Sequence, residues 1–171
     1  MARILLAAVV GIVVVAPVMV EARAQGLVTI QKLSADLANE LVGEAVAICA
    51  QKGYAVTAAV VDLDGVRQAM LRGNGAPVHT LDAAFYKAYS AASLTLALKE
   101  NGTKAVADRM NKAPRTSIPP TQLPNVTFYP GGVTIRAGDG TAIGAIGVGG
   151  SVDIDEECAR AAVAKIQDRI K

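Results

Sequence analysis

The spacing of hydrophobic and polar positions changes several times along the chain and predicts an α+β domain. Apolar residues recur with a helical period, and the predicted helices lie at 35–52, 81–100, 104–111 and 156–170. Runs of Val, Ile and Ala predict strands at 54–61 and 66–72, and all of 126–150 is β in character, with strands at 133–136 and 141–148. The order is therefore α-ββ-αα-βββ-α. Tight turns between strands favour a central antiparallel sheet of about five strands with helices packed against it, of the profilin- or PAS-like kind.

Local signals mark several element boundaries. Ser34 is a good N-cap for the first helix, and Gly53 is a typical residue to end it. Residues 62–65, Asp-Leu-Asp-Gly, are a strong turn signal that predicts a hairpin between the first two strands. The two carboxylates of this turn could bind a cation, but the further oxygen ligands of an EF-hand are missing. Turn chemistry is therefore the better interpretation.

Residues 1–24 have the pattern of a secretory signal. A short basic start precedes an apolar run at 4–15, and residues 22–24, Ala-Arg-Ala, precede a cleavage point at Gln25. The apolar stretch is nearly long enough for an uncleaved membrane anchor, but Pro17 and the Ala-x-Ala pattern favour cleavage. We therefore expect a periplasmic or secreted protein with one domain at 25–171 and no membrane contact after cleavage.

Composition narrows the partners and the redox chemistry. The formal net charge is only +2 and aromatic residues make up 4% of the chain, so nucleic acid is not an expected partner. Export implies an oxidising compartment, in which Cys49 and Cys158 either form a disulfide or pack as two buried thiols. The chain has no CxxC or CxxCH motif, which leaves thioredoxin-type chemistry and covalent haem attachment without support.

The stretch 73–80, Gly-Asn-Gly-Ala-Pro-Val-His-Thr, contains the only histidine of the protein. Its glycines and proline predict a loop, and Thr80 as N-cap with Asp82 in the first turn predicts a helix directly after it. His79 is then placed on a loop at a helix N-terminus, where side chains often meet ligands. A neutral imidazole there can bind a metal or a haem iron. The alternative is an ordinary surface histidine.

A second glycine-rich stretch, Gly-Ala-Ile-Gly-Val-Gly-Gly at 144–150, superficially resembles a phosphate-binding loop. It lacks the GxxxxGK[ST] pattern, and its glycines fall inside a predicted strand. We interpret it as a strand that another part of the backbone or another subunit approaches closely.

Several motifs together resemble one known family. They are Ala-Ala-Val-Val-Asp at 58–62, Arg-Gly-Asn-Gly-Ala at 72–76, His-Thr-Leu at 79–81, Lys-Ala-Tyr-Ser-Ala-Ala at 87–92, Pro-Gly-Gly at 130–132, the stretch 144–150, and Asp-Glu-Glu-Cys-Ala at 155–159. This set resembles the GlcG/HbpS family of haem-binding proteins, which includes the C-terminal domain of PduO-type proteins. The resemblance covers essentially all of 25–171. It implies a profilin-like domain that forms homodimers or larger homo-oligomers, and non-covalent haem as the cofactor.

The iron ligand is predicted from chemistry, because members of the family differ in the residue that meets the iron. His79 is the best candidate axial ligand, since it is the sole imidazole. Tyr86, Tyr89, Met70 and Met110 are candidate second ligands. For each of these four, packing in the core or an interface is the alternative.

Other charged residues are candidates for the haem periphery. Arg72, Lys87 and Arg115 could pair with the propionates as charge-assisted donors, although for Arg115 a solvated position is preferred. Gly75 belongs to the loop at 73–80 that carries His79, and it is expected to contact the cofactor. The acidic residues of 153–157 could hold an exposed iron or calcium ion, but acids are also favoured at a helix N-terminus, which we prefer.

The sequence thus favours an exported haem-binding protein: a carrier, a buffer or an accessory to haem sensing. An enzyme acting on a small molecule or on haem itself is an alternative, although no Ser-His-Asp set can be proposed. Oxidative haem breakdown needs no protein nucleophile. A structural oligomer without a ligand is the third possibility.

Overall fold

Antiparallel strands form the centre of the fold. The computed structural model describes residues 26–112 and 123–171. Its helices are α1 (Ala35–Gln51), α2 (Thr80–Leu98), α3 (Thr103–Lys112), α4 (Asp155–Ile166) and the short 3-10 helix η2 (Gln167–Arg169). Its strands are β1 (Thr57–Val61), β2 (Arg67–Arg72), β3 (Gly132–Arg136) and β4 (Ala142–Gly149). Within these ranges, no helix is long and apolar enough to cross a membrane.

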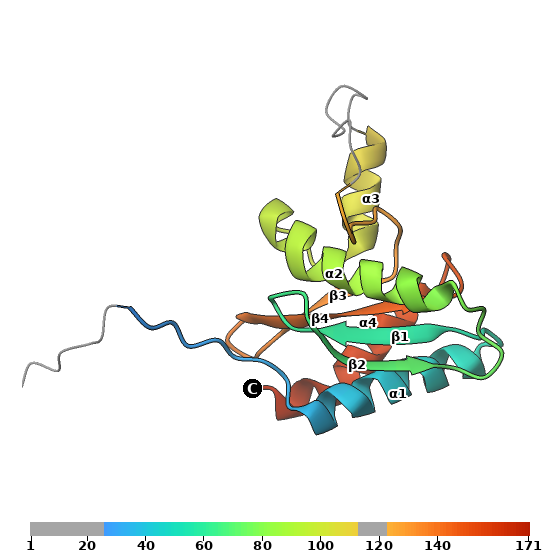
Figure 1. Cartoon of the computed structure of the whole chain (residues 1–171), viewed down its shortest axis with the longest axis horizontal. Helices are drawn as coiled ribbons and strands as arrows, with labels where there is room; N and C mark the ends of the chain where they lie inside the picture. The colour runs from blue at the N-terminus through green and yellow to red at the C-terminus, as the bar shows by residue number, and fades with distance from the viewer. Residues whose placement is uncertain (1–25, 113–122) are drawn as a thin grey trace, which may run out of the picture.

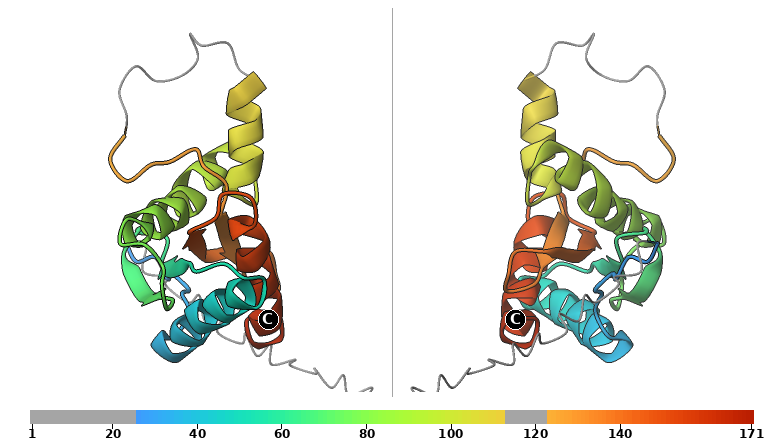
Figure 2. Two further views of the ribbon diagram at one scale, coloured as in Figure 1. Left: turned by 90° about the vertical axis from the view of Figure 1, so that its right-hand side faces the viewer. Right: turned by 90° about the vertical axis from the view of Figure 1, so that its left-hand side faces the viewer.

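The sheet has the order β2-β1-β4-β3, so β2 and β3 are its edges. All neighbouring strands are antiparallel. Figure 1 and Figure 2 show α2 on one face of the sheet and α1 with α4 on the other, while α3 stands away from the sheet. This arrangement confirms the predicted α+β class.

The strand count is the one difference from the predicted architecture. About five strands were expected, and the described residues form four. Residues 126–130 form no strand, and Gly131 meets the sheet only through its carbonyl, which accepts from the Val148 N–H at 2.9 Å. Instead the backbone N–H of Thr127 donates to the hydroxyl of Ser90 on α2, at 2.8 Å. The segment therefore runs along the helix layer before β3 begins.

The predicted boundaries of the first helix are confirmed. The Ser34 hydroxyl accepts a hydrogen bond from the backbone N–H of Leu37 at 3.2 Å, as an N-cap should. Gly53 follows the helix with φ of +84°, the left-handed conformation that glycine adopts without strain. The turn at 62–65 is confirmed as well, because the Asp62 carboxylate accepts from the backbone N–H groups of Asp64 and Val66. The Asp62 carboxylate is therefore engaged in hydrogen bonds within the turn.

Two apolar layers lie on the two faces of the sheet. The larger one fills the space between the sheet, α1 and α4. The smaller one, beneath α2, is mostly alanine: Ala59, Val61, Ala84, Phe85, Ala88, Ala91, Ala92 and Ala145. Small side chains let α2 approach the strands closely, so the distance between the helix and the sheet is short.

A disulfide between Cys49 and Cys158 joins α1 to α4, with a Cα–Cα distance of 5.7 Å. Of the two alternatives that the sequence left open, the structure therefore has the bridge. Both cysteines are fully buried in the larger apolar layer. The predicted signal at 1–24, Arg115 and most of the proline-rich segment after α3 lie outside the described residues.

Candidate functional site

The loop at 73–79 ends β2 and delivers His79 to the start of α2. Gly75 has φ of +79°, and the buried Ala76 closes a turn through its N–H to the Gly73 carbonyl at 3.1 Å. The guanidinium of Arg72 donates to the Ala76 carbonyl at 2.7 Å. The structure therefore places Gly75 and His79 on one loop, and Arg72 at the end of β2 where that loop begins.

His79 itself occupies the N-cap position of α2. Its side chain makes no capping hydrogen bond and is exposed to solvent. The prediction that Thr80 is the N-cap was wrong. The Thr80 hydroxyl lies in the core instead, where it donates to the Pro77 carbonyl at 2.6 Å and bonds the Thr57 hydroxyl of β1 at 2.7 Å. Buried hydroxyls need such partners, and this pair fastens the first residue of α2 to the sheet.

The first turns of α2 rest directly on the glycines of β4. A Cβ atom on Gly147 would lie 2.1 Å from the Ala84 carbonyl oxygen and 2.3 Å from the Ala88 nitrogen. A Cβ atom on Gly149 would lie 2.9 Å from the Ala84 nitrogen. This confirms the interpretation of 144–150 as a closely approached strand. Glycine is needed at both positions because a side chain there would clash with the backbone of α2, the helix that follows His79.

An aromatic and cationic cluster lies further along α2. The Arg67 guanidinium of β2 sits 3.7 Å from the centre of the Phe85 ring, a cation–π contact. Tyr86 and Tyr89 flank the same ring, with centroids 5.8 and 6.0 Å away. Met70 packs against this layer from β2. The surface between α2 and β2 therefore combines aromatic, thioether and cationic groups.

The candidate second ligands lie at different distances from His79. Tyr86 is seven residues along the helix, about 10 Å, and on nearly the same face. Tyr89 is about 15 Å along and covers Gly65 of the hairpin turn, where an added Cβ would lie 2.6 Å from its ring. Met110 lies on α3, beyond the other end of α2. Tyr86 is therefore the candidate that best shares a surface with His79.

Lys87 has a different position from the one expected of a propionate donor. It is 4% exposed, and its ammonium Nζ lies 2.6 Å from Oδ2 of Asp155 at the start of α4. The other oxygen of Asp155 accepts from the backbone N–H of Ser151 at 2.9 Å. Burial raises the pKa of the Asp155 carboxyl, while the Lys87 charge and the backbone N–H groups oppose that shift. In the described chain this lysine is a buried link between α2 and α4.

The acidic group at 153–157 lies around the start of α4, and three of its members occupy the first turn. The Glu156 carboxylate accepts from the Lys104 backbone N–H at 2.7 Å and pairs with Arg160 at 2.6 Å. Across residues 26–112 and 123–171, no three or more His, Cys, Asp and Glu side chains are grouped to hold a metal ion. The two buried acids of the group, Asp155 and Glu156, are therefore held by partners within the fold.

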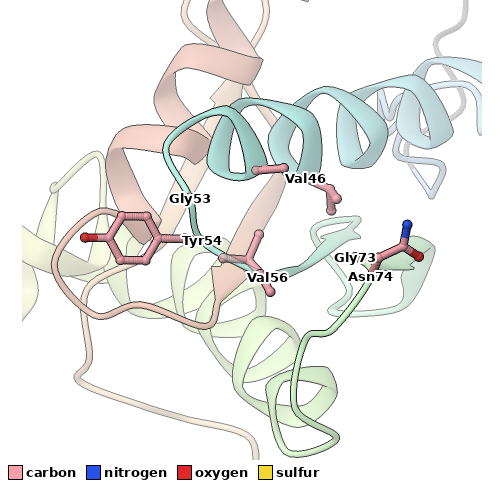
Figure 3. A pocket seen from close by; sticks show the side chains of 8 residues that line it. Val46, Gly53, Tyr54, Val56, Gly73 and Asn74 are labelled. Carbon is pink, nitrogen blue, oxygen red and sulfur yellow. The ribbon is translucent and has the colours of Figure 1, made fainter.

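A pocket of about 340 Å³ lies where α1 ends and the 73–79 loop begins. Val46 and Ala50 of α1, together with Val56, Gly73 and Asn74, form much of its lining. Figure 3 shows the Tyr54 ring on the far side, directed away from Asn74. The pocket is open and mostly apolar, and it adjoins the end of β2.

Sequence reasoning missed Arg67 and Thr57. Arg67 contacts Phe85 because a bulge between Val60 and Val61 changes the register of β2, so that Arg67 lies opposite Val61. No sequence pattern marks such a bulge. Thr57 could have been suspected as a polar residue inside a buried strand, which requires a hydrogen-bonding partner nearby.

Comparison with known proteins places this geometry in context. Residues 33–164 match the family described as "HbpS-like: Haem degrading protein HbpS-like". A crystal structure of a double mutant of HbpS from Streptomyces reticuli is 33% identical, with a TM-score of 0.72, and the match covers 88% of this chain and 98% of that one.

Other solved structures share the fold. The crystal structure of a PduOC:heme complex is 27% identical, with a TM-score of 0.64 and coverage of 78% of this chain and 94% of that one. Protein ORFY of Klebsiella pneumoniae, at 24% identity, has a TM-score of 0.69 and coverage of 81% and 93%. Comparison with the curated proteins finds no match.

Proposed function

The chain belongs to the HbpS-like family, and on that premise we propose that it is an exported haem-binding protein with His79 as an axial ligand of the iron. Its role would be that of a haem carrier, a haem buffer or an accessory to haem sensing. The similarity to a protein solved as a heme complex supports haem as the ligand class.

The observation that carries this proposal is the state of His79. The imidazole is exposed at the N-cap of α2 and is not used to cap the helix. A histidine with a structural role at that position would hydrogen-bond the first turn. An imidazole that is exposed on this loop and free of that task can bind iron.

The neighbouring residues suit the rest of a haem. Arg72 is held beside the loop by Ala76 and can pair with a propionate, and Arg67 offers a second guanidinium on the same side of the sheet. Met70 and Tyr86 supply apolar and aromatic contact area. Bound haem would supply redox-active iron, while these side chains bind and orient it. Lys87 takes no part in this proposal because its ammonium is paired with Asp155.

Export and assembly belong to the same proposal. A disulfide is the bond expected in an oxidising compartment such as the periplasm or the cell exterior, which supports export. The family resemblance and the alanine-rich composition favour a homodimer or a higher homo-oligomer.

A haemin titration of residues 25–171, followed by absorbance, tests the proposal. The wild-type protein should give a saturable Soret shift, and His79→Ala should lose or strongly alter it. Asn74→Ala changes another exposed side chain of the same loop and should bind like the wild type. A shift that survives His79→Ala would move the iron to another ligand, and no saturable shift in any variant would refute haem binding.

The family description also favours a second function, the oxidative breakdown of haem. Such a reaction would require bound haem, a reductant such as ascorbate and molecular oxygen or peroxide. It would appear as loss of the Soret band with release of iron, faster than for free haemin under the same conditions. Equal rates with and without the protein would leave a binding function alone.

A further inference from the structure

The chain contains two Asn-Gly steps, Asn74-Gly75 and Asn101-Gly102. Asparagine is a chemically labile residue, because the backbone nitrogen of the next residue can attack its side-chain amide. Glycine in that next position favours the attack, since it has no side chain to obstruct it. The two steps share this local chemistry, so any difference in their reactivity is set by the fold around them.

The first step lies free on the loop between β2 and α2, where Asn74 and Gly75 are both exposed. Within residues 26–112 and 123–171, neither the Asn74 side-chain amide nor the Gly75 N–H has a hydrogen-bonding partner. A Cβ built on Gly75 would meet only the Cβ of Ala55, at 3.9 Å, so the space around this residue is open. Figure 3 shows the Asn74 amide projecting from the loop. Both reacting groups are therefore free to approach each other.

The second step is held by its surroundings. The side-chain oxygen of Asn101 accepts a hydrogen bond from Nε of Arg136 at 3.1 Å. Gly102 is buried and is joined to β3 by an isolated β-bridge. A Cβ built on Gly102 would lie 2.5 Å from side-chain atoms of both Glu156 and Arg160, so this glycine is tightly enclosed. The Asn101 amide cannot turn toward the Gly102 nitrogen unless these contacts open.

We propose that Asn74 is a site of spontaneous deamidation, and that the fold protects Asn101 from the same reaction. The Gly75 backbone nitrogen gives up its proton and forms a bond with Cγ of Asn74. The bond from Cγ to the amide nitrogen breaks, and that nitrogen leaves as ammonia. One water molecule then opens the cyclic imide. Opening at the side-chain carbonyl gives aspartate, and opening at the main-chain carbonyl gives isoaspartate.

Either product changes the loop that leads to His79. Both add a negative charge, and isoaspartate also inserts a methylene group into the backbone of the turn that the Ala76 N–H closes on the Gly73 carbonyl at 3.1 Å. The contact between the Arg72 guanidinium and the Ala76 carbonyl depends on the same turn. Deamidated protein should therefore bind haemin more weakly, since its new carboxylate repels the propionates. This consequence, unlike the reaction itself, rests on the proposed function.

Peptide mapping by mass spectrometry tests the reaction. The folded protein is incubated in a mildly alkaline buffer, samples are digested over time, and the peptides of both Asn-Gly steps are followed. Conversion to an acid raises the mass of a peptide by one unit, and isoaspartate separates from aspartate on chromatography. Asn74 should convert at least about tenfold faster than Asn101, because Asn101 reacts only in molecules whose surroundings have opened locally. Equal rates, or a faster Asn101, would overturn the proposal.

The same protein unfolded in urea is the control for the sequence itself. There Asn101 loses its contacts, and the two steps should react at nearly the same rate. A folded protein that keeps Asn74 intact while the unfolded chain reacts at both steps would refute the proposal. Asn74→Ala removes the reacting amide, so the acidic form that isoelectric focusing detects in aged wild type should not accumulate. Its accumulation at the wild-type rate would place the reaction at another residue.

Haemin titrations of fresh and aged protein separate this inference from the proposed function. Aged wild type should lose affinity for haemin in proportion to its converted Asn74, while aged Asn74→Ala should bind as it did when fresh. Conversion of Asn74 without any Soret shift in fresh protein would keep the deamidation site and refute haem binding. Haem binding in a protein that does not convert Asn74 would keep the proposed function and refute the site.

Discussion

Replacing Asp155 with Asn should destabilise the fold strongly, because it leaves the Lys87 ammonium buried without a counter-charge. The two side chains are 5% and 0% exposed, and their charged atoms are 2.6 Å apart. A Cβ on Gly131 would lie 2.8 Å from Cδ of Lys87 and 2.9 Å from Cβ of Asp155, so that loop covers the pair closely. Water cannot readily replace the lost carboxylate.

The expected loss in the free energy of unfolding is about 3–5 kcal/mol, the usual cost of breaking a buried ion pair from one side. This is a large part of the 5–15 kcal/mol that typically stabilises a domain. Lys87→Met should cost a similar amount, because it strands the carboxylate. The double variant Lys87→Met/Asp155→Asn removes both charges, keeps a side-chain oxygen for the Ser151 N–H, and should recover most of the loss, since replacing both members of a buried pair by neutral residues often costs little.

Urea unfolding followed by circular dichroism measures these values. With a slope of about 2 kcal/mol per M, Asp155→Asn should lower the midpoint by about 2 M. Lys52→Ala is a matched control. It removes a pair with Glu157 of the same 2.6 Å length at the solvent-exposed surface, and it should cost less than about 1 kcal/mol. Equal losses for the buried and exposed pairs, or a double variant as unstable as the singles, would refute the reasoning.

Three further predictions concern α2, the disulfide and export. Gly147→Ala places a methyl group 2.1 Å from the Ala84 carbonyl oxygen, and it should lower the free energy of unfolding in urea by about 1–3 kcal/mol and weaken haemin binding. Wild-type behaviour in both assays would contradict the close approach of α2 to β4. Reducing the bridge between Cys49 and Cys158, 109 residues apart, should cost about 4.8 kcal/mol by loop-closure entropy, and a loss below about 1 kcal/mol would show that the bridge hardly constrains the unfolded chain. Mass spectrometry of protein expressed with its leader should find a chain beginning at Gln25 in the periplasmic fraction, whereas an intact, membrane-bound chain would favour the anchor.

Local signals were sufficient for much of the fold. Ser34 and Gly53 mark the ends of α1 because capping depends on residues close in sequence. The hairpin at 62–65 and the glycine-rich strand at 144–150 were predicted for the same reason. The loop that carries Gly75 and His79 was also placed correctly, after a strand and before a helix.

The remaining features could not be predicted, because they depend on contacts between residues that are far apart in the sequence. Thr80 has the side chain of an N-cap, but its hydroxyl bonds Thr57, a partner 23 residues away. Lys87 has the side chain of a surface residue, but Asp155, 68 residues away, makes its burial possible. No residue near Thr80 or Lys87 in the sequence indicates that Thr57 and Asp155 are their partners. The candidate haem site shares this limit, since Arg67 joins it only through the strand register.

The Cys49–Cys158 bridge has a consequence for durability outside the cell. It turns most of the domain into a covalent ring that contains the whole sheet, α2 and the 73–79 loop. A protease that cuts this ring once yields a nicked protein whose two pieces stay in one covalent molecule. The pieces then meet at a high effective concentration and can refold together. Release of a fragment requires a second cut or reduction of the disulfide, so the candidate haem site can survive the first proteolytic event.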